Sequence, residues 1–234
     1  MSDFKWRHYH GQIILWAVRW YCKYGVSYRE LAEMMNERGI PVDHTTIYRW
    51  TQKYAPKIEQ KLRWFWKPGY SSSWQIDETY IKVKGRWVYL YRAITKEGKT
   101  VNFYLSQTRN AKAAKIFLGK ALRSIKPYLH PETLNTDKDR AYAPALSALK
   151  KEGVCRQNIQ HRQVKYMNNR IESDHGKLKR MIKPTRGFQS MKTAFATIKG
   201  FEVMRMFRKK QMNVWLRNQG ILGEVRLIER QFSF

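Results

Sequence analysis

Acidic residues are the scarce component of this 234-residue sequence, which has 18 Asp and Glu against 46 Lys and Arg and a formal net charge of +28. A chain with this imbalance repels itself unless a polyanion lies nearby, and an enzyme of small molecules has no need of such a charge. Nucleic acid is therefore the expected partner.

Cysteine and long apolar runs are also lacking. Cys22 and Cys155 are the two cysteines, and neither lies in a CxxC pair, so the sequence favours neither a disulfide framework nor a zinc finger. We expect both to be thiols of the hydrophobic core. No run of about 18 apolar residues is present, and the first residues, MSDFKWRHYHGQ, have no signal-peptide pattern. These absences favour a cytoplasmic protein that makes no membrane contact.

A cluster of Pro, Gly and Ser residues at 67–73 separates a helical pattern from a strand-like pattern. Hydrophobic residues make up 43% of the sequence, enough for one medium core and a small satellite domain. We therefore predict a helical domain at 1–66, a linker at 67–73, a catalytic domain at 74–187, and a C-terminal basic helix with a tail at 188–234.

The helical domain has the pattern of a helix-turn-helix. Ser27 and Glu30 form a capping box that opens one helix, and Gly39 closes it. The next helix follows Asp43 and places its apolar residues on one face, which leaves its N-terminal polar residues to point elsewhere. In a helix-turn-helix such residues contact base edges, and here they are Thr45, Thr46 and Arg49. A three-helix bundle that merely packs fits the same pattern, and the excess of positive charge favours DNA binding.

From Trp74 the apolar residues alternate as in strands, with turns at Lys84-Gly85 and Lys96-Glu97-Gly98. Three antiparallel strands are followed by a helix capped by Asn110, a short strand at 133–136, a helix to Lys151, a fifth strand within 157–161 and a helix to Ile182. This element order predicts an α/β protein with a ribonuclease-H-like mixed sheet flanked by helices, preceded by the all-α helix-turn-helix domain.

Three acids converge on that frame. Asp77 lies in the first strand and Asp137 at the end of the fourth, and in a sheet where these strands are neighbours their carboxylates lie about one strand spacing, ~4.8 Å, apart. Glu172 comes from the last helix, in a region whose only other acids between Gln160 and Lys210 are Asp174 and Glu202. Carboxylates placed against the local charge are candidate ligands of Mg²⁺.

Other acids near the trio are alternative ligands. Glu78 follows Asp77 directly, but strand alternation turns it to the opposite side of the sheet. Asp139 lies two residues beyond Asp137, and Asp174 points away from the helix face that carries Glu172. Lys179 lies on that face, seven residues after Glu172, where it can reach a phosphate.

Three segments carry a resemblance to a known family, and they are Trp74-Gln-Ile-Asp77-Glu-Thr-Tyr80, Asn135-Thr-Asp137-Lys138 and Asn169-Arg-Ile-Glu172-Ser-Asp-His-Gly-Lys-Leu-Lys179. They resemble the DDE motif of bacterial insertion-sequence transposases, above all the insertion-sequence-six family. The resemblance covers nearly the whole chain and weakens from Asn213 to Phe234. It identifies Asp77, Asp137 and Glu172 as the catalytic and metal-binding acids and Lys179 as the basic residue that follows them.

The resemblance implies a transposase that binds the terminal inverted repeats of its element, cuts the DNA and joins the ends to a target. Its cofactors would be two Mg²⁺ ions, with Mn²⁺ as a substitute, and its partners double-stranded DNA and further copies of the chain, as a homodimer or larger. It would act in the bacterial cytoplasm at the nucleoid. Arg208, Lys209 and Lys210 add basic surface suited to a second DNA. A helix-turn-helix regulator without catalysis and a hydrolytic nuclease are the alternatives.

Overall fold

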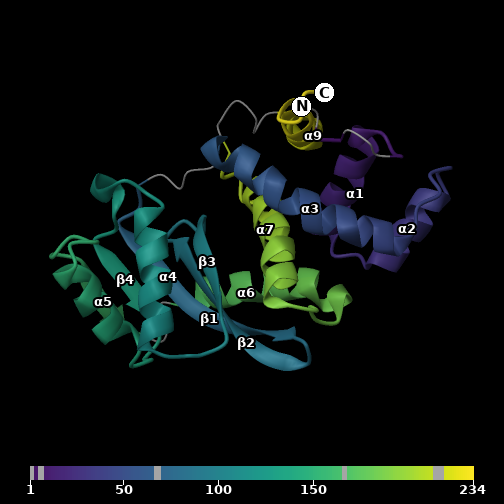
Figure 1. Ribbon diagram of the computed structural model, residues 1–234. Coiled ribbons are helices and arrows are strands. Elements are labelled where there is room, and N and C mark those ends of the chain that lie inside the picture. Colours follow the sequence, from purple (N-terminus) through teal and green to yellow (C-terminus); the bar gives the residue numbers. More distant parts are fainter. Residues whose placement is uncertain (1–2, 5–7, 66–69, 165–167, 213–218) are drawn as a thin grey trace. The chain divides into compact units, whose positions relative to one another are not determined.

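The computed structural model describes residues 3–4, 8–65, 70–164, 168–212 and 219–234 (Figure 1). The chain divides into two compact units. One consists of Lys67–Lys177 and contains the sheet, and the other combines Met1–Trp66 with Leu178–Phe234 and is helical.

The sheet has five strands in the order β3-β2-β1-β4-β5. The strands are β1 (Ser73–Val83), β2 (Arg86–Thr95), β3 (Thr100–Ser106), β4 (Thr133–Thr136) and β5 (Gln160–Gln163). The first three are antiparallel, and β4 and β5 run parallel to β1. This is the strand order of the ribonuclease-H-like fold, so the predicted fold class is confirmed. The fifth strand begins three residues later than the start of the predicted range.

Turn residues set the register of the antiparallel strands. Lys84 and Gly85 connect β1 to β2 with φ of 48° and 76°, the two positive values that a tight hairpin turn requires. Gly98, with φ of 86°, makes the turn before β3. The long β1–β2 hairpin that results pairs Asp77 with Arg92 and Glu78 with Tyr91.

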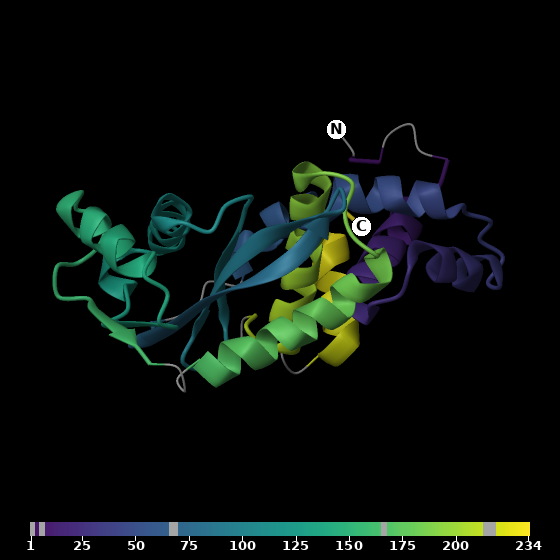
Figure 2. The ribbon, with the colours of Figure 1, turned by 90° about the horizontal axis from the view of Figure 1, so that it is seen from below.

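Helices cover both faces of the sheet (Figure 2). Asn110 caps α4 (Ala111–Arg123) by accepting a hydrogen bond from the Ala113 amide, as predicted. With α5 (Tyr142–Lys151), this helix buries a core that includes Trp74 and Ile76 of β1. On the other face, α6 (Asn169–Ile182) is attached by an ion pair of 2.6 Å between Asp174 and the fully buried Arg92.

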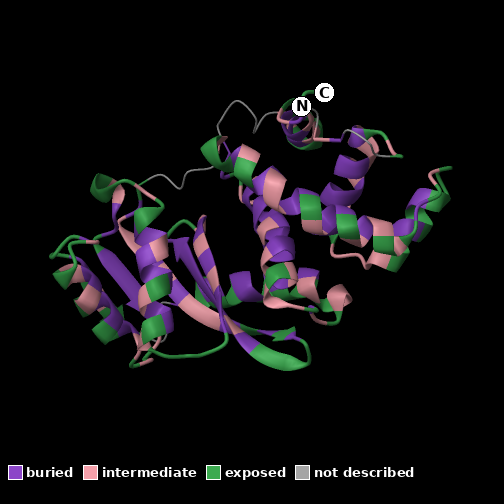
Figure 3. Cartoon of the chain, in the orientation of Figure 1, coloured by how far each residue is buried: buried purple, intermediate pink, exposed green. Residues whose placement is uncertain are grey.

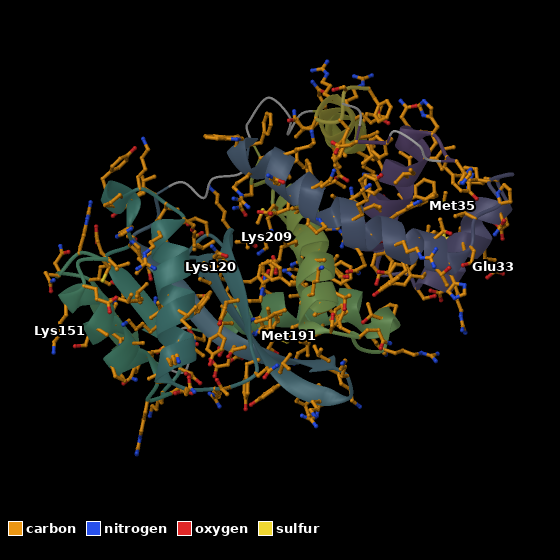
Figure 4. The ribbon with its side chains drawn as sticks, in the orientation of Figure 1. Glu33, Met35, Lys120, Lys151, Met191 and Lys209 are labelled. Carbon is orange, nitrogen blue, oxygen red and sulfur yellow. The ribbon has the colours of Figure 1, made fainter. Side chains whose placement is uncertain are left out.

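The helical unit contains α1 (Gly11–Tyr24), α2 (Tyr28–Asn36), α3 (His44–Leu62), α7 (Met191–Arg208) and α9 (Gly220–Arg230), with short 3-10 turns at Arg63–Phe65 and Lys183–Thr185. Another 3-10 turn, Pro127–Leu129, lies in the sheet unit. The capping box of Ser27 with Glu30 is present, and Asp43 caps α3. The two helices of the predicted helix-turn-helix are therefore α2 and α3. Met35 of α2 is buried and Glu33 is exposed (Figure 4).

The C-terminal helices pack with the N-terminal ones in this unit. The reason is that α7 has buried residues on most of its sides and needs several partners, which it finds in α3 and α1. Glu224 of α9 forms buried ion pairs of 2.5 Å with both Arg19 and Lys23 of α1. Both cysteines are free and buried, as expected of core thiols.

The crossing of α7 with α1 and α3 is tightest at Gly200. A Cβ atom at this position would overlap the Cys22 Sγ and lie 2.9 Å from the Ala55 Cβ. Real Cβ atoms do not approach other atoms so closely, so a side chain here would push the three helices apart.

We predict that Gly200→Ala destabilises the protein by about 1–3 kcal/mol, because overpacking outweighs the better helix propensity of alanine. Gly176 of α6 has no atom within 4 Å of an added Cβ, so Gly176→Ala is the matched control and should stabilise by about 0.5–1 kcal/mol. Urea unfolding of both variants measures this. A Gly200→Ala protein as stable as the wild type would show that the crossing is loose.

Candidate active site

Three carboxylates meet where β4 ends beside β1. One oxygen from each of Asp77, Glu78 and Asp137 lies within 4.8 Å of the other two, and this is a group of three potential metal ligands among the described residues. The parallel pairing of Gln75 with Asn135 brings Asp77 level with Asp137, which comes directly after β4. The predicted meeting of these two carboxylates is therefore found.

A turn fixes the Asp137 carboxylate. Its Oδ1 accepts a hydrogen bond of 3.0 Å from the Asp139 amide, and the Asp139 Oδ1 accepts one of 2.6 Å from the Ala141 amide. Aspartates commonly bond the backbone two residues ahead in this way. The two linked turns carry the chain from the end of β4 into α5, and they keep both carboxylates beside the sheet.

Glu78 joins the acids although alternation directs it to the other face. Its Oε2 accepts a hydrogen bond of 2.6 Å from the Tyr142 hydroxyl, on the face covered by α4 and α5. The pairing of β1 with β4 stops at Gln75, so beyond this point none of the described strands pairs with that side of β1. A glutamate side chain can therefore curve around the strand edge and approach Asp77. Alternation predicts the direction of Glu78 correctly, but not the position of its carboxylate.

Arg109, which follows β3, is a site residue that the sequence analysis did not identify. Its guanidinium contacts the Glu78 Oε1, lies 2.8 Å from the Asp139 Oδ2 and lies 3.6 Å from the Asp137 Oδ2. One arginine thus bridges three acids. The only available signal was its place next to the Asn110 cap, which is too weak to single it out among so many basic residues.

Burial and mutual repulsion make the acid cluster costly to ionise. Desolvation, together with the charges of Glu78, Asp137 and Glu172, raises the pKa of Asp77 to about 7, against a hydrogen bond from the Glu78 backbone that lowers it. Desolvation also raises the pKa of Glu78, although the Tyr142 hydroxyl and Arg109 oppose the rise. A bound cation would relieve both effects. The oxygens are spaced as ligands of one hard cation are, so the residues fit a divalent metal.

Glu172 lies on α6 and is exposed, close enough to affect the Asp77 carboxyl but outside the group of three. The buried side of α6 carries Asp174, paired with Arg92, and His175, whose Nδ1 lies 3.5 Å from the Asp77 Oδ2. Asp174 therefore anchors the helix, and His175 contacts a member of the trio.

The predicted DNA-binding residues lie in the helical unit. Thr45 and Arg49 are exposed in the first turns of α3, and Thr46 is half-buried. Lys179 is exposed on α6. Arg208 ends α7 and donates a hydrogen bond to the Lys23 carbonyl, and Lys209 and Lys210 follow the helix.

Other basic residues of α7 are engaged within the protein. Lys199 lies 2.9 Å from Glu59, and Arg205 is buried beside Glu202. The basic surface of α7 is therefore smaller than its sequence indicates. No helix among the described residues is both long and apolar enough to cross a bilayer.

Comparison with known proteins gives consistent matches over most of the chain. The model of a family described as a DDE domain matches residues 71–211. The transposase for insertion sequence-like element IS431mec of Staphylococcus aureus (strain Mu50) is 39% identical over 217 residues, which are 90% of each chain. The S. aureus transposase for insertion sequence element IS257 in transposon Tn4003 is 38% identical over the same length.

Solved structures give more distant matches. The HTLV-2 integrase catalytic core domain in complex with magnesium is 16% identical, with a TM-score of 0.43 over 57% of this chain and 86% of that chain. The simian T-cell lymphotropic virus intasome is 19% identical, with a TM-score of 0.42 over 56% of this chain and 49% of that chain.

The raised pKa of Asp77 predicts how stability depends on pH without metal. Between about pH 4 and pH 7 the folded protein keeps a proton that the unfolded chain has released, so stability falls as the pH rises through this window. The Asp77→Asn variant has no carboxyl at this position, so its stability does not fall for this reason. We therefore predict that, in EDTA, the variant is more stable than the wild type by about 2–4 kcal/mol above pH 7, and that this advantage shrinks toward pH 4.

Urea unfolding at several pH values measures the difference, and Glu152→Gln, at an exposed pair with Lys115 outside the group of three carboxylates, serves as the control. Mn²⁺ should raise the midpoint of the wild type and not that of Asp77→Asn, because only the wild type keeps the full ligand set. An Asp77→Asn protein that loses stability at pH 8 would contradict the predicted electrostatic cost.

Proposed function

The chain belongs to the DDE transposases of bacterial insertion sequences, in the insertion-sequence-six family, and from this membership we propose how its residues act on DNA. It is a polynucleotidyl transferase that cuts DNA and joins the cut strand to a target. We propose that its substrates are the terminal inverted repeats of its own element and a target duplex, and that Asp77, Asp137 and Glu172 form its catalytic centre.

The observation that carries this proposal is the gathering of carboxylates at the end of β4 in a chain of net charge +28. Such a cluster is unfavourable by itself, as the raised pKa of Asp77 indicates. Two Mg²⁺ or Mn²⁺ ions held by Asp77, Asp137 and Glu172 would supply positive charge for the phosphodiester that reacts. Glu78 is a further potential ligand, because its carboxylate lies in the same group.

The surrounding residues have supporting roles in this proposal. His175 orients the Asp77 carboxylate, and the turns after β4 orient Asp137. Arg109 holds the acids together before metal enters, and its exposed side chain can then turn toward a DNA phosphate. No Ser or Tyr nucleophile is assigned, because water and the 3′-hydroxyl of the cut strand are the attacking groups in hydrolysis followed by transesterification.

Two ends must be processed in one complex, so we propose that the chain works as a homodimer or larger assembly, at the nucleoid of the bacterial cytoplasm. In each copy, α3 would read the terminal repeat through Thr45, Thr46 and Arg49. Lys179, Arg208, Lys209 and Lys210 would contact phosphates of the element ends and the target. The exposure of Thr45 and Arg49 supports this assignment.

We predict that Asp77→Asn, Asp137→Asn and Glu172→Gln each reduce cleavage and joining by more than ~100-fold, because each removes a charged metal ligand. Binding to element ends should be retained or strengthened, since a negative charge near DNA is lost. Labelled ends incubated with Mg²⁺ and target DNA, with products resolved on a gel, provide the measurement.

The matched control is Glu152→Gln, which changes an exposed carboxylate at the residue after α5, paired with Lys115, and should leave activity unchanged. If one of the three variants keeps more than a small fraction of cleavage, that residue does not belong to the centre. Cleavage by the wild type without any joined product would favour a hydrolytic nuclease.

Recognition by α3 gives a separate prediction. Replacing Thr45, Thr46 or Arg49 with Ala should reduce the preference for element ends over random duplex, by about 1–3 kcal/mol where a bidentate base contact is lost. Arg29→Ala, at an exposed position on α2, is the control for a general loss of charge and should affect both duplexes equally. Competition binding measures both affinities. Equal losses on both duplexes for all three α3 variants would mean that α2 and α3 only support the fold.

A further inference from the structure

The far half of the β1–β2 hairpin exposes one face that carries aromatic and basic side chains. Tyr80 and Lys82 of β1 pair across the strands with Tyr89 and Trp87 of β2, and we call these four residues the hairpin face. Trp87 is 64% exposed and Tyr80 is 44% exposed. The end of the hairpin is correspondingly coloured as exposed in Figure 3.

The two faces of this half of the hairpin differ in their exposure to solvent. On the opposite face, Ile81, Val83 and Val88 are all buried, with at most 5% exposure. The buried positions of β1 also change phase at the acids, because Trp74 and Ile76 are buried before them and Thr79 and Ile81 after them. The hairpin face therefore continues the face of β1 that α4 and α5 cover at Trp74 and Ile76, but here that face is exposed.

Its charge suits a polyanion. From Thr79 to Lys96 the sequence contains no Asp or Glu, and Lys84 and Arg86 are exposed at the turn next to Lys82 and Trp87. The Lys82 ammonium lies 5.9 Å from the centre of the Trp87 ring, and the Tyr80 and Tyr89 rings lie 5.2 Å apart. The aromatic rings are thus held in place by cross-strand pairs, with cations beside them.

The hairpin face starts at the acid cluster. Glu78 belongs to the same face of β1 and reaches Asp77 and Asp137 with its carboxylate. Lys82 lies four positions after Glu78, a distance of about 13 Å along a strand. DNA with a phosphodiester at the acids can therefore extend along this face.

We propose that the hairpin face binds unpaired nucleotides adjacent to the reacting phosphodiester, with bases stacked on Trp87 and Tyr80 and phosphates on Lys82 and on Lys84 of the adjoining turn. This inference rests on the proposed function, since that function puts DNA at the acids. Unpaired bases fit better than duplex because the flat side of a base is free to stack only when its neighbour has been removed. Stacking is independent of sequence, as a surface beside a target site requires.

Binding to two fluorescent DNA probes in EDTA tests the proposal without any chemistry. One probe is a blunt duplex. The other, called the forked probe, has the same duplex with a short unpaired extension on one strand. We expect Trp87→Ala and Tyr80→Ala to weaken binding of the forked probe by about 5–100-fold, and to change binding of the blunt probe by less than about twofold. Trp87→Phe should keep most of the affinity for the forked probe.

Tyr128 offers a matched control, because it is 61% exposed on the same unit and also carries a lysine, Lys126, 5.6 Å from its ring. Tyr128→Ala should leave both probes unaffected. Equal losses on the two probes would show that the hairpin face binds duplex, and no loss with either hairpin variant would show that it binds no DNA, so both outcomes overturn the proposal. Circular dichroism checks the folding of each variant, and Tyr80→Ala decides the matter if Trp87→Ala does not fold.

The outcome is separate from the test of the proposed function. Metal-dependent cleavage and joining by the wild type, measured on element ends, decides whether the chain acts as proposed on DNA. A wild type that joins DNA and hairpin variants that bind the forked probe normally would reject the hairpin inference alone.

Discussion

The repulsion among carboxylates at the end of β4 is the constraint on which the rest of the catalytic unit depends. Asp77, Glu78 and Asp137 place oxygens within 4.8 Å of one another in a partly buried position, and the pKa of Asp77 rises to about 7. A folded protein accepts this cost only where neighbouring groups hold the acids in position. Here strand β1 holds the backbone of Asp77 and Glu78, and linked turns hold Asp137. The Tyr142 hydroxyl and Arg109 hold the carboxylate of Glu78.

The same constraint links the fold to the chemistry. The parallel pairing of β1 with β4 ends at Gln75. Asp77 and Glu78 lie beyond the paired residues, so their carboxylates have room to approach that of Asp137. The buried pair of Arg92 with Asp174 fastens α6 to the opposite face, and through this helix it sets the place of Glu172 and His175. Beyond the acids, Tyr80 and Trp87 of the hairpin are exposed on one face, and this is the surface that we propose for unpaired DNA.

Much of this could be read from the sequence, because local patterns determine it. The turns at Gly85 and Gly98, the caps at Ser27, Asp43 and Asn110, and the parity of Asp77 along its strand each depend on a few neighbouring residues. What could not be read depends on distant contacts. Arg109 reaches three acids in two other segments, β1 and the turn after β4. Glu78 curves around a strand edge that pairing alone defines, and Glu224 binds α9 to α1 across 205 positions of sequence. Periodicity gives the direction of a side chain, but not the position of its far end.

The central claim is that the acid cluster holds a proton until a divalent cation replaces it. Calorimetric titration with Mn²⁺ in buffers of different ionisation enthalpy counts the protons released on binding. If Asp77 has a pKa of about 7, binding at about pH 6 should release most of one proton, and the release should vanish as the pH rises well above 7. Binding of Mn²⁺ at pH 6 without proton release would contradict the account.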